Sequence, residues 1–139
     1  MRTIVQAKSW PSPRFRYSPL VAAGPFVKTA GMIALDSSTG ELEKGGPGAE
    51  TAKILSALGK VLSELKLETS SVVSVTVYTT DFDRFSDINA AWNDFFDGDT
   101  SPPARTSVGV SALPLGATVE MDFLLYAPEL ESSAEPQRK

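Results

Sequence analysis

Alternating apolar and polar residues predict strands in six parts of the chain. The clearest is 71–80, which is rich in β-branched residues and carries valines on one side and hydroxyl side chains on the other, as a half-buried strand does. Its two sides are Val73, Val75 and Val77, and Ser74, Thr76 and Tyr78. By the same pattern, strands are predicted at residues 2–6, 20–23, 26–33, 71–80, 105–111 and 118–126.

Two segments instead repeat apolar residues every three or four positions, which predicts amphipathic helices at about residues 49–65 and 84–96. Asp83 is the expected N-cap of the second helix and Gly98 its terminator. The first apolar stripe comprises Ile54, Leu55, Leu58, Val61, Leu62 and Leu65. The second comprises Phe85, Ile88, Trp92, Phe95 and Phe96.

The predicted order is therefore β-β-β-α-β-α-β-β, an α+β fold. One mixed sheet with both helices packed on one face would bury both helical stripes and the valine faces in a single core. The 139 residues suit one domain, which we place at 1–127. Residues 128–139 are polar and lack aromatic side chains, so we expect a flexible C-terminal tail.

The last two strands carry the best functional clue. Because the link between them is short and contains proline, an antiparallel hairpin is the simplest topology. Its register would set Arg105 opposite Asp122 and place Glu120 diagonally from Arg105 on the same face. The opposite face of this hairpin would supply core residues, namely Val108, Val110, Val119, Met121 and Phe123.

The other face of the predicted sheet carries small polar side chains. Two interpretations stay open: the face meets copies of itself in a homo-oligomer, or it is an open face in contact with solvent. Its predicted members are Ser74, Thr76, Ser107, Gly109, Ser111 and Thr118.

The chain has no histidine and no cysteine. This excludes a serine–histidine–aspartate triad, a cysteine nucleophile, a zinc finger and an imidazole base.

The net charge of −4 argues against nucleic acid as the main partner. The one local basic group, Lys8, Arg14 and Arg16, fits a solvated loop better than a phosphate-binding arm. No segment has the apolar length of a secretion signal or membrane span, so we expect a cytoplasmic protein.

Several motifs in order resemble the reactive intermediate deaminase family, also called YjgF-type or Rid proteins. The resemblance spans roughly residues 15–126 and is most specific at the arginine after Pro-Ala and the glutamate of the last strand. The motifs are Tyr17-Ser18-Pro19, Thr29-Ala30-Gly31, LDSSTGEL at 35–42, VTVYTTDFDRFSDINAAWNDFF at 75–96 and PPARTSVGVSALPLGATVEMDF at 102–123.

The resemblance implies a chorismate-mutase-like homotrimer with a cleft between each pair of neighbouring subunits. It also implies hydrolysis of short-lived 2-imino acids and enamines, such as 2-aminoacrylate and 2-iminopropanoate, to 2-keto acids and ammonia. No metal or organic cofactor is expected. A guanidinium grips a planar carboxylate with two parallel hydrogen bonds, so Arg105 is the candidate clamp, and Glu120 is the candidate to orient water or carry a proton.

By the same resemblance, four further residues bind substrate. Tyr17 lines the cleft, Gly31 lets backbone groups approach, and Asn89 assists from the second helix. Ser107 stands where many members have cysteine, and its hydroxyl can hydrogen-bond a substrate.

Two other departures affect the expected cleft. Ala30 stands where members of the family commonly have a serine, just before the glycine that is Gly31 here. Phe15-Arg16-Tyr17 replaces the usual Gly-Pro-Tyr. The added cation at Arg16 suggests the hypothesis of a dicarboxylate or larger imino acid.

Alternatives remain for the candidate residues and for the function. Arg105 and Glu120 fit a structural ion pair at a subunit interface, Asp122 is placed to share the role of Glu120, and Tyr17 and Asn89 fit packing or surface roles. A non-catalytic trimer that binds carboxylate metabolites or a partner protein is the competing function. RNA cleavage, which has been attributed to some relatives, fits poorly with the acidic charge and missing histidine.

Overall fold

The computed structural model describes residues 1–99 and 101–130. Its element order matches the prediction, except that the strand predicted at 26–33 is broken in two. The strands are β1 (Thr3–Ile4), β2 (Leu20–Ala23), β3 (Phe26–Thr29), β4 (Met32–Ile33), β5 (Val72–Thr79), β6 (Ala104–Gly109) and β7 (Val119–Tyr126). The helices are α1 (Pro47–Glu64) and α2 (Phe85–Phe95).

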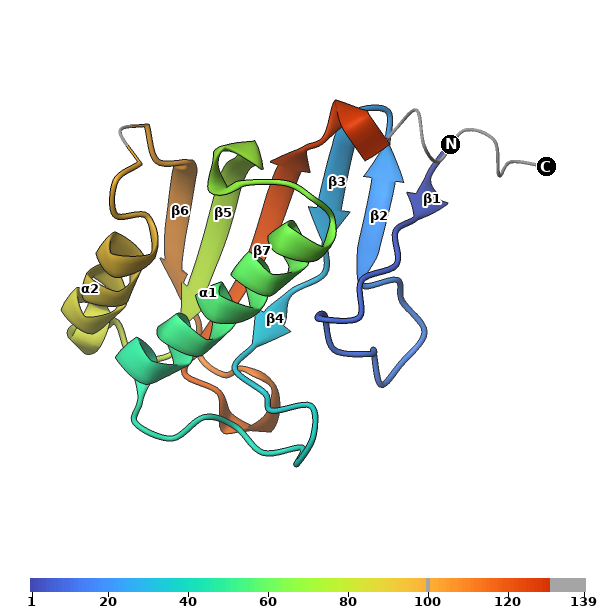
Figure 1. Ribbon diagram of the computed structural model, residues 1–139. Coiled ribbons are helices and arrows are strands. Elements are labelled where there is room, and N and C mark those ends of the chain that lie inside the picture. The colour runs from blue at the N-terminus through green and yellow to red at the C-terminus, as the bar shows by residue number, and fades with distance from the viewer. Residues whose placement is uncertain (100, 131–139) are drawn as a thin grey trace.

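All strands join one mixed sheet in the order β1-β2-β3-β7-β5-β6, with β4 also paired to β7. Only β5 and β6 run parallel, and α2 connects them as a crossover, as a parallel pair requires. Both helices lie on the same face of the sheet (Figure 1). This confirms the predicted α+β arrangement of one mixed sheet with helices on one side.

The predicted hairpin of the last two strands is wrong. β5 lies between β6 and β7, pairing with β6 in parallel and with β7 antiparallel. The segment between β6 and β7, which includes a 3-10 turn at Pro114–Gly116, therefore passes beneath the end of β5 instead of closing a tight turn. Alternation fixes the faces of a strand, but it does not fix which strand is its neighbour.

This topology separates the two residues that the hairpin would have joined. Val75 pairs with both Arg105 and Phe123, so Arg105 points to the helix-covered face. Tyr78 pairs with Glu120, so Glu120 points to the open face. In one chain, Arg105 and Glu120 lie on opposite faces of the sheet.

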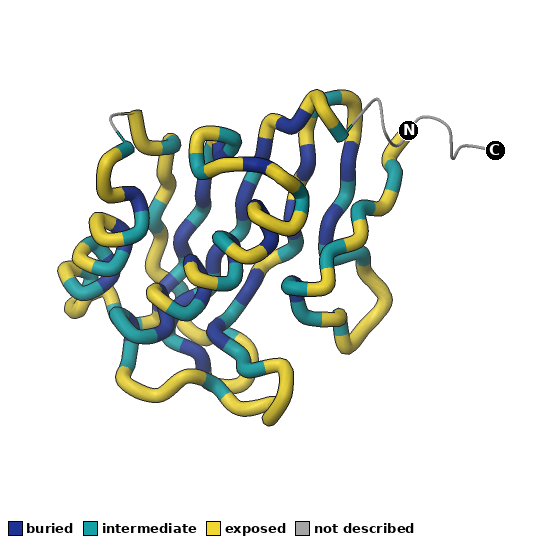
Figure 2. The backbone as a smooth tube through the Cα atoms, in the orientation of Figure 1, coloured by how far each residue is buried: buried dark blue, intermediate teal, exposed yellow. Residues whose placement is uncertain are grey.

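The core lies between the helices and the central strands. Buried segments gather on β3, β5 and β7 and on the side of α1 that faces them, whereas β6 is largely exposed (Figure 2). The predicted core positions Val119, Met121 and Phe123 are fully buried. Val108 is exposed and lies on the open face, because its partner on β5 is Tyr78.

Other local predictions also need correction. Val73 is exposed, because a β-bulge between Val72 and Ser74 shifts the register there. Asp83 does not cap α2: the helix follows a 3-10 turn, and its N-cap residue is Arg84, without a side-chain cap bond. Ser107 lies on the helix-covered face, opposite Val77, and not on the open face.

The buried carboxylate of Glu50 ties α1 to the start of β7. It accepts hydrogen bonds from the backbone N–H groups of Thr118 and Val119 and from the Thr118 hydroxyl, at 2.8–3.2 Å. These bonds satisfy a charge that would otherwise be costly to bury, and they fix the chain just before Glu120.

The structure describes three residues beyond the predicted domain boundary at residue 127. Leu130 still packs against the core, and the rest of the predicted tail, 131–139, lies outside the described residues. In the described part of the chain, neither helix is both long and apolar enough to span a membrane.

Candidate functional site

A cavity of about 380 Å³ lies where the N-terminal loop, β4 and the turn before β7 meet. Three of the predicted site residues, Tyr17, Gly31 and Glu120, line it, and we call these three the cavity half-site. The remaining lining residues are Trp10, Pro11, Ser12, Arg14, Phe15, Pro19, Ala30, Met32, Ile33, Leu35, Pro114 and Leu115.

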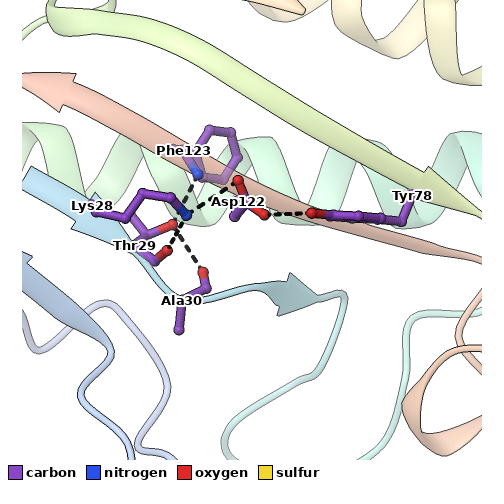
Figure 3. Close-up of polar contacts among 6 residues, drawn as sticks. All are labelled: Lys28, Thr29, Ala30, Tyr78, Asp122 and Phe123. Carbon is purple, nitrogen blue, oxygen red and sulfur yellow. Dashed lines mark hydrogen bonds and ion pairs between the residues drawn. The ribbon is translucent and has the colours of Figure 1, made fainter. Parts of the chain in front are cut away.

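A break in the sheet shapes this half-site. Lys28 pairs with Leu124 and Met32 with Met121, which leaves three residues on the β3–β4 side opposite two on β7. The extra residue forms a bulge. The backbone N–H of Phe123 donates to the Thr29 hydroxyl at 3.0 Å, and that hydroxyl donates to the Ala30 carbonyl at 2.9 Å (Figure 3). The Thr29 hydroxyl therefore replaces a backbone hydrogen bond that is lost where the pairing with β7 is interrupted.

The bulge brings Gly31 directly under the Glu120 side chain. A Cβ atom at position 31 would collide with Oε2 of Glu120 and would lie 2.9 Å from its Cδ. Only glycine leaves room for the carboxylate in this position. The absence of a Cβ at position 31 therefore lets the Glu120 side chain lie close against the backbone.

The environment of Glu120 favours its neutral form. Partial burial raises the pKa of the Glu120 carboxyl above its ordinary value, and the negative charge of Asp122 raises it further. A carboxyl group with a raised pKa exchanges protons closer to neutral pH, as a general acid or base requires.

Asp122 is held in a different way. Lys28 Nζ lies 3.2 Å from one of its oxygens, and the Tyr78 hydroxyl donates to the other at 3.0 Å (Figure 3). Burial and the bond to Asp122 raise the pKa of Tyr78, so the phenol stays protonated as a donor. Each Asp122 oxygen therefore contacts a side chain of a neighbouring strand, and the carboxylate lies beside Glu120 on the open face.

Arg105 lies on the other face, at the edge of the sheet. Its guanidinium carbon is 5.1 Å from the ring centroid of Phe85 and 4.8 Å from that of Trp92, both on α2. Such stacking orients the planar group. Partial burial lowers the pKa of Arg105, but arginine remains charged. Within residues 1–99 and 101–130, no carboxylate forms an ion pair with it.

Two more predicted residues lie on the same side of the sheet as Arg105. Ser107 follows on the same face of β6. Asn89 stands four residues after Phe85 and three before Trp92, on the helix face that Arg105 contacts. We call Asn89, Arg105 and Ser107 the arginine half-site.

The structure thus divides the six predicted residues into two groups and does not bring Arg105 and Glu120 together within one chain. The sequence reasoning missed Arg14, which lines the cavity. The sequence predicted that the added cation would be Arg16, two positions later, but Arg16 is not among the lining residues. The irregular, proline-rich loop gives no periodicity from which the direction of either side chain can be predicted.

A family model decides the affiliation of the chain. The model described as Endoribonuclease L-PSP matches residues 7–127. The chain belongs to this family, the YjgF/Rid family.

Similar proteins carry several names. This Rid-family protein is 36% identical to a RutC family protein of Synechocystis, over 90% of this chain and 96% of that one. It is 30% identical to 2-iminobutanoate/2-iminopropanoate deaminase of Rattus norvegicus, over 89% of each chain. The crystal structure of E. coli TdcF with bound serine superposes with a TM-score of 0.81 at 25% identity, over 89% of this chain and 98% of that one.

Neither half-site resembles a metal centre. No group of three or more histidine, cysteine, aspartate or glutamate side chains suited to a metal ion occurs in the described part of the chain. The donors at the two half-sites are a carboxyl, a phenol, a hydroxyl, an amide and a guanidinium, which suit an organic anion and water.

Proposed function

We propose that this Rid-family protein hydrolyses reactive 2-imino acids and their enamine tautomers to 2-keto acids and ammonia. The observation that carries the proposal is the Glu120 carboxyl, which is held over Gly31 in a cavity with its pKa raised. Two relatives support it: the rat protein is named as an imino acid deaminase, and TdcF was crystallised with serine, an α-amino carboxylate.

The site is completed between protomers. Arg105 and Glu120 lie on opposite faces of one chain, so a substrate that touches both must lie between two copies. A cyclic trimer places one surface of each protomer against a different surface of the next. In that assembly, the arginine half-site of one protomer faces the cavity half-site of its neighbour and closes a cleft.

The reaction needs only water and these side chains. Arg105 holds the substrate carboxylate with two charge-assisted hydrogen bonds, which positions the C=N carbon at the cavity half-site. Glu120 accepts a proton from the attacking water as the C–O bond forms. The same carboxyl delivers this proton to the nitrogen, which leaves a tetrahedral carbon that carries a hydroxyl and an amino group. Glu120 then takes the hydroxyl proton as the C=O bond forms and passes it to the nitrogen, so that the C–N bond breaks and ammonia leaves.

The competing function is a non-catalytic trimer that binds carboxylate metabolites. It would use the same Arg105 guanidinium, which stacks on Phe85 and Trp92 and has no ion-pair partner among the described residues. Such a binder would be protected against thermal unfolding by a 2-keto acid without accelerating imine decay.

An imine-decay assay separates the two functions. Imines generated in situ by an amino-acid oxidase should decay faster with the wild-type protein. Arg105→Ala should lose about 10- to 100-fold in kcat/KM, the scale of hydrogen bonds to a charged group, while size-exclusion chromatography shows an unchanged oligomer. Arg105→Lys is the matched control, because it keeps the charge but not the paired geometry, and it should recover only part of the activity. Full activity in Arg105→Ala would rule out the clamp.

A further inference from the structure

The segment between β1 and β2 is a long loop whose position depends on very few bonds. Residues 5–19 belong to no helix or strand, and in Figure 1 they run as an irregular loop beside the sheet. Within the described residues, every hydrogen bond that joins residues 6–18 to the rest of the chain goes to one side chain, that of Glu64 on α1.

The Glu64 carboxylate accepts three hydrogen bonds from this loop. The backbone N–H of Lys8 donates to one oxygen at 2.6 Å, and the backbone N–H of Ser9 donates to the other at 3.0 Å. The Ser9 hydroxyl donates to that second oxygen at 2.9 Å. Both oxygens of one carboxylate therefore hold two consecutive residues of a loop that is more than fifty positions away in the sequence.

Trp10 connects this contact to the functional site. It follows Ser9 directly, is 6% exposed and packs edge-to-face on Phe123 of β7, with the ring centroids 6.2 Å apart. Trp10 also lines the cavity, as do five later residues of the loop, among them Tyr17. A shift at Lys8 and Ser9 would therefore move a whole wall of the cavity.

The needs of α1 itself do not explain an acidic residue at position 64. Glu64 is the last residue of α1, where the helix dipole disfavours a negative charge, and no basic residue lies in the last turn. The hydrogen bonds from the loop offset this cost. The N–H groups of Lys8 and Ser9 lower the pKa of Glu64 below its ordinary value, so the carboxylate stays ionised at neutral pH.

We propose that Glu64 is a positioning residue for the reaction: it anchors the N-terminal loop to the end of α1, and this anchor holds Tyr17 in place for substrate binding. The inference rests on the proposed function, because Tyr17 belongs to the cavity half-site. Glu64 does not line the cavity, and neither Glu120 nor Arg105 lies on the loop. Loss of the anchor should therefore weaken substrate binding more than the chemical step.

Glu64→Gln tests the anchor, because the amide replaces one acceptor oxygen with an NH2 group that cannot accept a hydrogen bond. Hydrogen–deuterium exchange should be about tenfold faster in peptides that cover residues 6–18 and unchanged in β5 and β7. KM for the imine should rise about 3- to 10-fold, the scale of a lost hydrogen bond to a charged group at an exposed position. kcat should change by less than about twofold.

Two further variants make the comparison specific. Ser9→Ala removes one of the three hydrogen bonds and should change exchange and KM in the same direction by a smaller factor. Glu68→Gln is the matched control, because Glu68 is exposed and its carboxylate forms no ion pair or hydrogen bond among the described residues. It should leave both measurements unchanged. Wild-type exchange of the loop in Glu64→Gln, or an equal rise in KM in Glu68→Gln, would overturn the anchor.

A binding measurement separates this inference from the proposed reaction. Titration calorimetry with pyruvate, a stable 2-keto acid, should show about 3- to 10-fold weaker binding to Glu64→Gln than to the wild type. If the loop exchanges faster and pyruvate binds more weakly but no imine is hydrolysed, the anchor stands and the proposed reaction fails. If both proteins hydrolyse imines with the same KM and the loop exchanges at the wild-type rate, the reaction stands and the anchor fails.

Discussion

Glu120 depends on Gly31 more directly than on any other residue. The carboxylate occupies the space where the Cβ of any other residue would lie. Gly31 does not have a positive φ, so an alanine there would not strain the backbone. Substitution at position 31 therefore tests the position of Glu120 separately from the stability of the fold.

We expect Gly31→Ala to displace the Glu120 side chain and to lower kcat for imine hydrolysis by about 100-fold, the scale of a 1 Å misplacement of a catalytic group. Circular dichroism should show a folded protein. Gly59→Ala on α1 is the control, because its new Cβ would make an ordinary 3.4 Å contact with Phe95 far from the cavity. Equal activity in both variants would show that the position of Glu120 does not matter.

The raised pKa of Glu120 also predicts how stability depends on pH. The folded state holds the proton more tightly than the unfolded chain, so unfolding free energy falls as pH rises from the ordinary carboxyl pKa through the raised one. Glu120→Gln removes this pH-dependent loss of unfolding free energy. Because the group is only half-buried, we expect a modest gain of about 1–3 °C in melting temperature at pH 7, which disappears at low pH. Destabilisation at pH 7 would contradict the assigned environment.

At the scale of elements, the sequence pattern located nearly every helix and strand but not the order of strands in the sheet. The stripes of α1 and α2 and the alternation in β5 and β7 are strong periodic signals. Neighbouring strands are set by the connections between elements. α2 forms a crossover between β5 and β6, and such a crossover favours a parallel pair of strands. This connection decided which strand lies beside β6, although the link between β6 and β7 is short.

The break between β3 and β4 also could not be predicted from the alternation of apolar and polar residues. Residues 26–33 look like one continuous strand, and the extra residue becomes visible only when both pairings with β7 are known. Thr29 marks the place, because a buried hydroxyl there replaces a lost ladder bond. A threonine in a strand is too common for its role to be recognised in advance.

Thr29→Val should destabilise the protein, because it keeps the shape of the side chain but leaves the buried N–H of Phe123 without an acceptor. The expected loss is about 1–3 kcal/mol in unfolding free energy, measured by urea denaturation at fixed protein concentration. Thr29→Ser, which keeps the hydroxyl, should retain most of the stability. If valine and serine variants are equally stable, the hydroxyl does not hold the bulge.

At the scale of the whole molecule, the strand pattern singled out Arg105 and Glu120, the resemblance added the other four candidate residues, and their division into two half-sites required coordinates. Neither half-site has all the groups that the reaction needs. Glu120 and Arg105 point to opposite faces of the sheet, so we expect that only an assembly of several protomers is active. The central claim is that each cleft takes Arg105 from one protomer and Glu120 from the next.

Complementation between two inactive variants tests this claim most directly. Arg105→Ala and Glu120→Gln would be purified separately and also co-expressed with different tags, so that mixed oligomers can be isolated. In randomly mixed cyclic trimers, about a quarter of the clefts would combine an intact Arg105 with an intact Glu120 from neighbouring protomers. We expect the mixture to hydrolyse imines at about a quarter of the wild-type rate, while each variant alone is nearly inactive. Mixed oligomers that are no more active than the separate variants would contradict it.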